Sequence, residues 1–495
     1  MIDAVIFSLP YTNLDQIQSG PAVLSGILNE NRFKSKAFDF GTELFDLCGR
    51  DIELFYEIQN YFLSPVSKTN PIIEKFYQRI IDILNENPAR YIGVSVFTVW
   101  SHRSVFEITQ RIRQSNLKSK IILGGRGLGK RVYIEAFSKD TLSSHERKMK
   151  FSDVMRARGL ADHNVLGDGE DSILKIIQGN IKKNPTGEIL ESDQFRSPTP
   201  NYENYQFDLY LQNERHLPIT GSKGCVRDCD FCDIREQFGS YRYRTGDNIA
   251  EEMLRLKQQY GINKFLFTDS LVNGNQKELI NFCNIIADYN KKNPTDKIKW
   301  TGQWICRPQR QIKDNLYEVI AASGGEGLTV GMESGSDSVL DAMNKKTDVK
   351  AMFDELEQFR QHGITCTLLT FVGHHSETFD NFKEHCQTLI RILPYVRSGT
   401  VSAMAAGDVM FMLDGTPAIK NPDIIRSEFA PDTIWVSRFN PTNTYKERIA
   451  RRIIVQRIFE KYKIPGVNNY GNYHHIEKTM RSYGDQINEF YALSY

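Results

Sequence analysis

The chain has 495 residues, which is too long for one hydrophobic core and predicts two or three domains of ordinary size. Lysine and arginine number 62 and aspartate and glutamate number 61, so the formal net charge is +1. This balance excludes a global field that would draw the protein to nucleic acid or to an anionic membrane, and any such partner must be met by a local patch.

The first ten residues contain no basic leader and only a short apolar run, which indicates a first strand rather than a signal peptide. No later apolar run approaches the roughly 20 residues that span a bilayer. We therefore expect a cytoplasmic protein without a membrane span. Three of the eight cysteines fall between positions 225 and 232, and the other five are scattered. In a reducing compartment, such clustering points to metal rather than to disulfides.

The first 190 residues alternate strand-like and helical runs, which predicts a doubly wound, Rossmann-like parallel sheet with helices on both faces. Tyr91–Thr98 is apolar enough to be a strand buried on both sides. The other strand candidates are Ala4–Leu9, Lys36–Asp39, Lys120–Leu123 and His163–Leu166. Helices are expected at Pro21–Asn31, Ser101–Ser115 and Asp171–Gln178.

A polar stretch with prolines, Glu191–Gln206, has no strong periodicity and marks a linker over 191–215. From 216 to 405 a strand followed by a helix recurs six times, which predicts a partial or complete parallel barrel. Its strand candidates are Leu217–Thr220, Lys264–Thr268, Lys297–Thr301, Gly327–Met332, Thr365–Val372 and Thr400–Met404.

A mainly helical C-terminal extension is expected over 406–495, including a basic amphipathic helix at Thr444–Lys463. The tail beyond this helix is rich in aromatic residues. Two alternatives for this tail stay open. It forms a lid over the barrel mouth, or it packs against the outside of the barrel as ordinary core.

The segment with the clearest chemistry runs from Gly221 to Cys232 and contains Cys225, Cys229 and Cys232. Three closely spaced thiolates can wrap one cuboidal iron–sulfur cluster and leave one iron without a protein ligand. Zinc is the alternative, but a structural zinc site normally has four protein ligands, and no nearby Cys or His stands at a suitable spacing.

The three-then-two spacing of these cysteines, with Phe231 directly before the last one, resembles the signature of the radical S-adenosylmethionine (SAM) superfamily. The resemblance implies a 4Fe–4S cluster whose open iron chelates the amino and carboxylate groups of SAM. It further implies that one electron from the reduced cluster cleaves SAM to a 5′-deoxyadenosyl radical. We expect the electron donor to be a protein such as flavodoxin or ferredoxin.

Further matches follow in order along the predicted barrel. Thr268 and Asp269 end an apolar strand as if they faced a ligand, and Gly331–Leu340 resembles the family's fourth-strand motif. Phe371–Thr378 resembles the fifth-strand glycine motif, which lets the backbone approach the adenine. The residues expected at SAM are Phe231, Thr268, Asp269, Arg307, Glu333, Ser334 and Gly373. For Arg307 the alternative is an ordinary surface arginine, and no catalytic side chain is identified.

Two histidine pairs, His374-His375 and His474-His475, have no carboxylate or cysteine beside them in the sequence. We therefore expect both pairs in solvated loops rather than in metal sites.

An open parallel sheet, a linker and then the cysteine motif together resemble the radical SAM class that carries a cobalamin-binding domain before the barrel. Gly124-Gly125 and Val165–Glu170 resemble two of its loops. The Asp-x-His-x-x-Gly motif that supplies a lower axial histidine is absent. The resemblance implies cobalamin contacts at the carboxyl ends of the strands: Ser8, Val99, Gly124, Gly125 and Gly167. The alternative is a vestigial domain that only shapes the roof of the active site.

Two functions stay open from the sequence. One is methylation of an unactivated carbon through cobalamin, and the other is direct use of the radical for ring formation, rearrangement or oxidation. Methylthio transfer is less expected, because it would need further cysteines in the N-terminal domain, where Cys48 is the sole one. The substrate is expected to be a small molecule or peptide rather than RNA.

Overall fold

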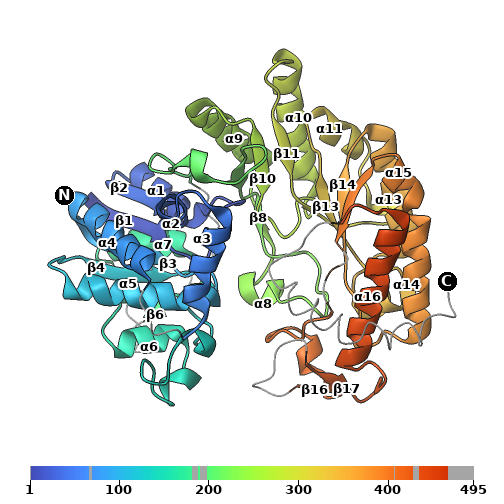
Figure 1. The fold of residues 1–495 in the computed structure, drawn as a ribbon. Helices are drawn as coiled ribbons and strands as arrows, with labels where there is room; N and C mark the ends of the chain where they lie inside the picture. Colours follow the sequence, from blue (N-terminus) through green and yellow to red (C-terminus); the bar gives the residue numbers. More distant parts are fainter. Residues whose placement is uncertain are drawn as a thin grey trace. The chain divides into compact units, whose positions relative to one another are not determined.

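The computed structural model describes residues 2–65, 70–180, 188–189, 198–405, 407, 409–426 and 434–466. The chain divides into two compact units, Met1–Pro218 and Ile219–Tyr495. Each unit is described below by itself (Figure 1). None of the helices in the described residues is both long enough and apolar enough to cross a membrane.

The first unit is built on a six-stranded sheet with the order β2-β1-β3-β4-β5-β6. All five strand pairs are parallel. The strands are β1 (Ile2–Ser8), β2 (Ser35–Asp39), β3 (Ala89–Ser95), β4 (Lys120–Gly124), β5 (His163–Val165) and β6 (Glu188–Ile189). The expected doubly wound parallel sheet is confirmed, and β6 is a strand that the sequence pattern did not predict.

Within the described residues of this unit, seven α-helices cover the two faces of the sheet. They are α1 (Ser19–Glu30), α2 (Phe40–Leu47), α3 (Ile52–Gln59), α4 (Pro71–Glu86), α5 (His102–Gln114), α6 (Phe151–Ala157) and α7 (Gly169–Ile177). Side chains of β1 alternate between two cores, as they must in a strand that is buried on both sides. Ala4 and Ile6 join the core under α1 and α7, whereas Val5 and Phe7 join the larger core of the opposite face.

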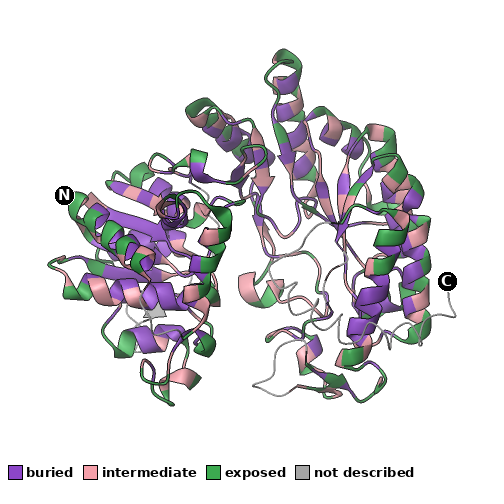
Figure 2. Cartoon of the chain, in the orientation of Figure 1, coloured by how far each residue is buried: buried purple, intermediate pink, exposed green. Residues whose placement is uncertain are grey.

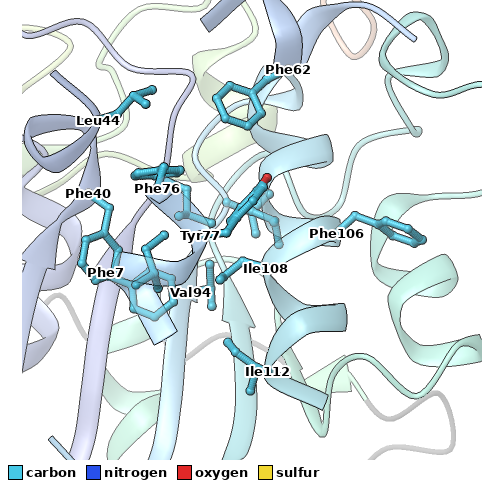
Figure 3. Close-up of a cluster of buried hydrophobic side chains, with 14 of the residues drawn as sticks. Phe7, Phe40, Leu44, Phe62, Phe76, Tyr77, Val94, Phe106, Ile108 and Ile112 are labelled. Carbon is cyan, nitrogen blue, oxygen red and sulfur yellow. The ribbon is translucent and has the colours of Figure 1, made fainter. Parts of the chain in front are cut away.

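The larger core is rich in aromatic side chains contributed by β1, α2, α4 and α5 (Figure 3). Phe7 and Phe40 pack with ring centroids 4.9 Å apart, and Phe62 meets Tyr77 edge to face. Helix α4 has Asn70 as its N-cap, whose side chain accepts from Ile72 N, and Pro71 as its first residue. This combination starts a helix well, because proline lacks the N–H that would be left unbonded there.

The described part of the predicted linker, residues 198–215, is packed on the first unit. Asn201 N donates to Ala22 O, Tyr205 OH donates to Gln18 O, and Tyr210 OH donates to Asp39 Oδ2 at 2.7 Å. These aromatic residues are buried, which explains why a proline-rich stretch without periodicity is nevertheless ordered.

The second unit contains parallel strands in two adjoining sheets, β11-β10-β7 and β12-β13-β14-β15. β11 and β12 belong to one stretch of chain that is interrupted at Gly302, whose O accepts from Thr329 N. When these two are counted as one strand, six strands follow one another across the two sheets. They are β7 (Leu217–Ile219, which spans the boundary of the units), β10 (Lys264–Phe267), β11 (Lys299–Thr301) with β12 (Gln303–Trp304), β13 (Leu328–Glu333), β14 (Cys366–Thr370) and β15 (Val401–Ala405).

This order confirms a partial parallel barrel with edges at β7 and β15. Its helices are α9 (Gly246–Tyr260), α10 (Gln276–Lys292), α11 (Leu316–Ala322), α12 (Asp337–Ala342), α13 (Val349–His362), α14 (Phe379–Arg391) and α15 (Leu393–Arg397). Figure 2 shows that the strands are mostly buried, whereas the helices are green on their outer faces.

The main element in the described part of the C-terminal extension is a long helix, as expected. This part consists of a short antiparallel pair, β16 (Ile424–Ile425) with β17 (Val436–Ser437), a 3-10 turn and the helix α16 (Tyr445–Tyr462). The prediction that α16 is a basic amphipathic helix is wrong, because Arg448, Arg451 and Arg452 are buried together with the apolar residues of the helix. The aromatic tail and His474-His475 lie outside the described residues.

Candidate functional site

The three clustered cysteines lie on a loop between β8 (Ser222–Lys223) and the short helix α8 (Ile234–Phe238). Cys229 is buried, Cys225 and Cys232 are partly buried, and all three are free thiols. Three thiolates on one loop suit a cuboidal cluster with one open corner, whereas a structural zinc ion normally takes four protein ligands.

Burial favours the protonated, neutral form of the thiols in this loop. Burial raises the pKa of Cys229 to about 12 and that of Cys232 to about 11, and each thiol is also disfavoured as a thiolate by its neighbouring cysteines. Thiolates are the form that ligates metal, so a positively charged centre must compensate for their burial. The donor set therefore fits an iron–sulfur cluster.

Asp269, predicted to face a ligand, instead anchors the start of the cysteine loop. Its Oδ1 accepts from Gly221 N at 2.7 Å and its Oδ2 accepts from Ser222 Oγ at 2.6 Å. The residue is 5% exposed, and burial raises the pKa of its carboxyl to about 7. Thr268 Oγ1 lies 2.8 Å from Thr220 Oγ1 on the neighbouring strand. Both side chains thus bind the protein itself around the first barrel strand.

Glu333 lies beside the cysteine loop at the end of β13. Its φ is +61°, and its Oε1 accepts from the buried Lys345 Nζ at 2.7 Å. The Glu333 charge contributes to the raised pKa of Cys229, and Lys345 opposes it, so both charges act on the cysteine loop. Ser334 is buried, and its Oγ accepts from Ser336 N at 3.2 Å.

Gly373 begins the loop after β14 with a φ of +82°. Its N donates to Glu377 Oε1 at 3.0 Å, and Arg451 Nη1 donates to the same oxygen at 2.7 Å within a fully buried ion pair. A Cβ at position 373 would lie 2.3 Å from Cγ of Arg448. The space beside this glycine is therefore filled by the aliphatic stem of an arginine on α16.

His374 and His375 do not lie in a solvated loop, so that prediction is wrong. His374 is fully buried, and both rings contact the carboxylate of Asp230, between Cys229 and Cys232. The pKa of Asp230 is lowered to about 2, since hydrogen bonds from the two rings outweigh burial, which alone would raise it. Sequence reasoning missed this group because Asp230 lies 144 residues before His374 and no local pattern joins them.

Arg307 follows β12 and is held by backbone contacts. Its N donates to Glu355 Oε2 and its Nη2 donates to Asn273 O, each at 3.1 Å. Burial raises the pKa of Glu355 to about 7, although it accepts further hydrogen bonds from Trp304 and Tyr317. The structure therefore places Arg307 on a buried polar network of the barrel.

Phe231 packs into an apolar cluster that brings the C-terminal extension to the cysteine loop. Its ring lies 5.0 Å from that of Phe371, and both pack against Met410, Met412, Ala418 and Trp435. Met410 N donates to Val372 O, and Trp435 Nε1 donates to Met410 O. The described part of the extension thus covers both the cysteine loop and the loop after β14.

The residues expected at cobalamin all lie at the carboxyl edge of the first unit's sheet. Ser8 ends β1 and Gly124 ends β4, while Gly125 and Gly167 have φ values of +112° and +92°, and Val99 begins a 3-10 turn. A Cβ at Gly125 would lie 2.6 Å from Val96 O. Ser8 Oγ donates to the buried Asp39 at 3.0 Å.

The loop after β3 adds exposed aromatic surface to this edge. Phe97 and Trp100 are 56% and 44% exposed, and Tyr11 meets Trp100 with ring centroids 5.5 Å apart. His102 is buried nearby and uses both ring nitrogens, because Nδ1 accepts from Tyr133 N and Nε2 lies 2.9 Å from Gly127 O. It has no nitrogen left to ligate a metal.

Comparisons with known proteins agree with this geometry. Residues 219–389 match the family model of the radical SAM superfamily. The anaerobic magnesium-protoporphyrin IX monomethyl ester cyclase of Cereibacter sphaeroides is 26% identical over 164 residues, which is 33% of this chain and 26% of that protein. The ribosomal protein uS12 methylthiotransferase RimO of Clostridium botulinum is 25% identical over 205 residues, 40% of this chain and 46% of that protein. The chain thus spans about half or less of these relatives' length.

Two solved structures share the fold over nearly the whole chain. The cobalamin-dependent radical SAM enzyme OxsB with aqua-cobalamin superposes with a TM-score of 0.64 at 15% identity, covering 98% of this chain and 72% of that one. The radical SAM methyltransferase TsrM of Kitasatospora setae, with cobalamin and a [4Fe-4S] cluster, gives a TM-score of 0.60 at 13% identity, covering 98% and 100%. With its cysteine loop on a partial parallel barrel, the stretch 219–389 is thus similar to the radical SAM superfamily in both sequence and fold.

Proposed function

We propose that the protein is a cobalamin-dependent radical SAM enzyme that methylates an unactivated carbon of a small molecule or peptide. The observation that carries this proposal is the fold: a doubly wound sheet precedes the barrel, and OxsB and TsrM share that arrangement over nearly the whole chain. The same proposal divides the chain into a cobalamin-binding-like domain at 1–190, a linker at 191–215, a radical SAM barrel at 216–405 and a C-terminal extension at 406–495.

Cys225, Cys229 and Cys232 would hold the 4Fe–4S cluster that this superfamily uses together with SAM. When bound, the cluster supplies the electron that cleaves SAM reductively. Glu333, whose carboxylate lies beside the cysteine loop, would accept from an ammonium group, and Lys345 balances its charge. Phe231 and the apolar cluster around it exclude water from that side of the loop.

The carboxyl edge of the first sheet would hold cobalamin without a lower histidine ligand. Gly124 ends β4 there, Gly125 and Gly167 turn the following loops at positive φ, and Phe97 and Trp100 present apolar surface of the kind that a corrin ring buries. His102 is occupied by hydrogen bonds on both ring nitrogens, which argues against it as the axial ligand.

A second candidate function is radical cyclisation, rearrangement or oxidation without methyl transfer. It is favoured by the similarity of the barrel to an anaerobic cyclase. Methylthio transfer receives less support, because Cys48 is buried in the core of the first unit and cannot contribute to a second cluster without unfolding that core.

The test is to load the anaerobically reconstituted protein with cobalamin under reducing conditions and to pass it through gel filtration. The proposal expects retained corrin absorbance of a base-off species, unchanged by His102→Ala. Dithionite and SAM should then yield 5′-deoxyadenosine, and S-adenosylhomocysteine should appear as a second product. Release of 5′-deoxyadenosine by protein that retains no corrin would favour the second candidate instead.

A further inference from the structure

Asp230 joins the cysteine loop to the loop that follows β14. Its Oδ1 and Oδ2 lie 3.0 and 3.1 Å from Nε2 of His374, and its Oδ2 lies 2.7 Å from Nε2 of His375. The Asp230 and His375 side chains are each 16% exposed, and that of His374 is 0% exposed. One carboxylate thus binds both histidines, from a position one residue after Cys229.

The backbone around this contact is bonded just as closely. Asp230 N donates to Met343 O at 3.0 Å, and Asp230 O accepts from Ala418 N at 2.9 Å. Asn443 Nδ2 donates to His374 O at 2.7 Å. The cysteine loop, the loop after β14 and the C-terminal extension therefore meet at Asp230 and its two partners.

Two histidines and one carboxylate are also a donor set for a divalent cation. The hydrogen bonding of His374 argues against that use. Ser376 N donates to Nδ1 of His374 at 3.3 Å, so Nδ1 is an acceptor and the proton of the neutral ring is on Nε2. A protonated Nε2 donates to Asp230 and has no lone pair for a metal. The group is therefore a hydrogen-bonded clamp.

We propose that Asp230 is a positioning residue that, through His374 and His375, fixes the cysteine loop against the Gly373 loop. This inference rests on the proposed function, since it takes SAM to span both loops, with its methionine end at the cluster and its adenosine end at Gly373. The clamp then sets the separation of the two ends. Loosening it leaves the cluster able to chelate SAM but misaligns the bond that is cleaved, and a misplacement of about 1 Å costs about 100-fold in rate.

The test compares His375→Leu with His375→Gln in cluster-loaded protein. Leucine cannot donate to Asp230, whereas the glutamine amide can. We expect both variants to retain iron and to bind SAM within about threefold of wild type, while His375→Leu cleaves SAM at least about tenfold more slowly per cluster. His375→Gln should recover to within about threefold. Asp230→Asn, which removes the charge and replaces one of the two acceptor oxygens with a donor, should be slowed as well. His145→Leu, at an exposed position of the first unit, is the matched control and should be unchanged.

A second readout does not depend on SAM. Amide hydrogen exchange over 226–233 in the cluster-loaded protein should be faster in His375→Leu and return towards wild type in His375→Gln. The clamp would be overturned if His375→Leu showed the same amide hydrogen exchange as wild type, or if both variants cleaved SAM equally slowly. It would also be overturned if wild type bound one extra divalent ion that both variants lose. Failure of wild type to cleave SAM would instead refute the proposed function, and the exchange data would still test the contact.

Discussion

Gly373→Ala should destabilise the second unit through a clash with Arg448. The added Cβ would lie 2.3 Å from Cγ and 2.4 Å from Cδ of that side chain. The stem cannot swing aside freely, because Nη1 donates to Asn443 O at 2.6 Å, Nη2 donates to Trp435 O at 3.0 Å, and the guanidinium lies 3.8 Å from the Trp435 ring centroid. Relief of the clash therefore requires those contacts to break.

The cost has two parts that a control separates. A non-glycine residue at a φ of +82° costs about 1–2 kcal/mol. Hydrogen bonds to a charged group contribute about 1.5–3 kcal/mol each, so losing one of them adds that amount. Gly399 has a nearly equal φ of +79°, and nothing lies within 4 Å of its Cβ position, so Gly399→Ala carries the first cost alone.

The assay is thermal unfolding of cluster-loaded protein, followed by circular dichroism. Gly373→Ala should lower the Tm by roughly 10 °C, and Gly399→Ala by a few degrees, at about 2–4 °C per kcal/mol. Arg448→Ala combined with Gly373→Ala should cost less than the sum of the two single changes, because the clash is gone. Equal Tm losses for the two glycine variants, or strict additivity of the pair, would refute the reasoning.

Three further predictions concern the cluster, a buried carboxyl and a buried ion pair. The triple Cys225/Cys229/Cys232→Ala variant should hold almost no iron after anaerobic reconstitution, whereas Cys283→Ala, on the buried face of α10, should hold about four irons per chain; a full cluster in the triple variant would contradict this. Burial raises the pKa of Asp269 to about 7 in the folded protein, whereas the carboxyl of the unfolded chain loses its proton above about pH 4. Proton binding at Asp269 therefore stabilises the folded state fully below about pH 4, and this stabilisation is lost as the pH rises to about 7. The unfolding free energy of wild type should therefore fall relative to that of Asp269→Asn between pH 5 and 7.5 in urea titrations, and a pH-independent difference would count against this. Arg451→Met should cost about 3–5 kcal/mol, since it leaves the fully buried Glu377 carboxylate uncompensated, whereas Glu377→Gln should cost less, because Arg451 keeps its ion pair with Glu447. The double variant should cost less than the sum of the two single changes; thermal unfolding decides, and simple addition would mean that the pair is not coupled.

Local pattern in the sequence determined the parallel sheet of the first unit, the barrel and the cysteine loop. Each of these depends on short-range features: β1 and β3 are apolar on both faces, and the cysteines lie within one loop. Periodicity and ligand spacing are properties of neighbouring residues, so one sequence suffices to read them.

The tertiary structure alone decided which side chains meet around that loop. Asp269 lies 48 residues from Gly221, and Asp230 lies 144 residues from His374. These residues are in contact in the structure, but no local sequence pattern shows that they meet. The arginines of α16 looked like a solvated face because they are charged, yet burial is set by what packs on the helix. Glu377 and Trp435 accept their hydrogen bonds, and Gly373 packs against the stem of Arg448. Charge pattern predicts solvent exposure only where no distant segment supplies partners, and here the C-terminal extension and the loop after β14 supply them for each other.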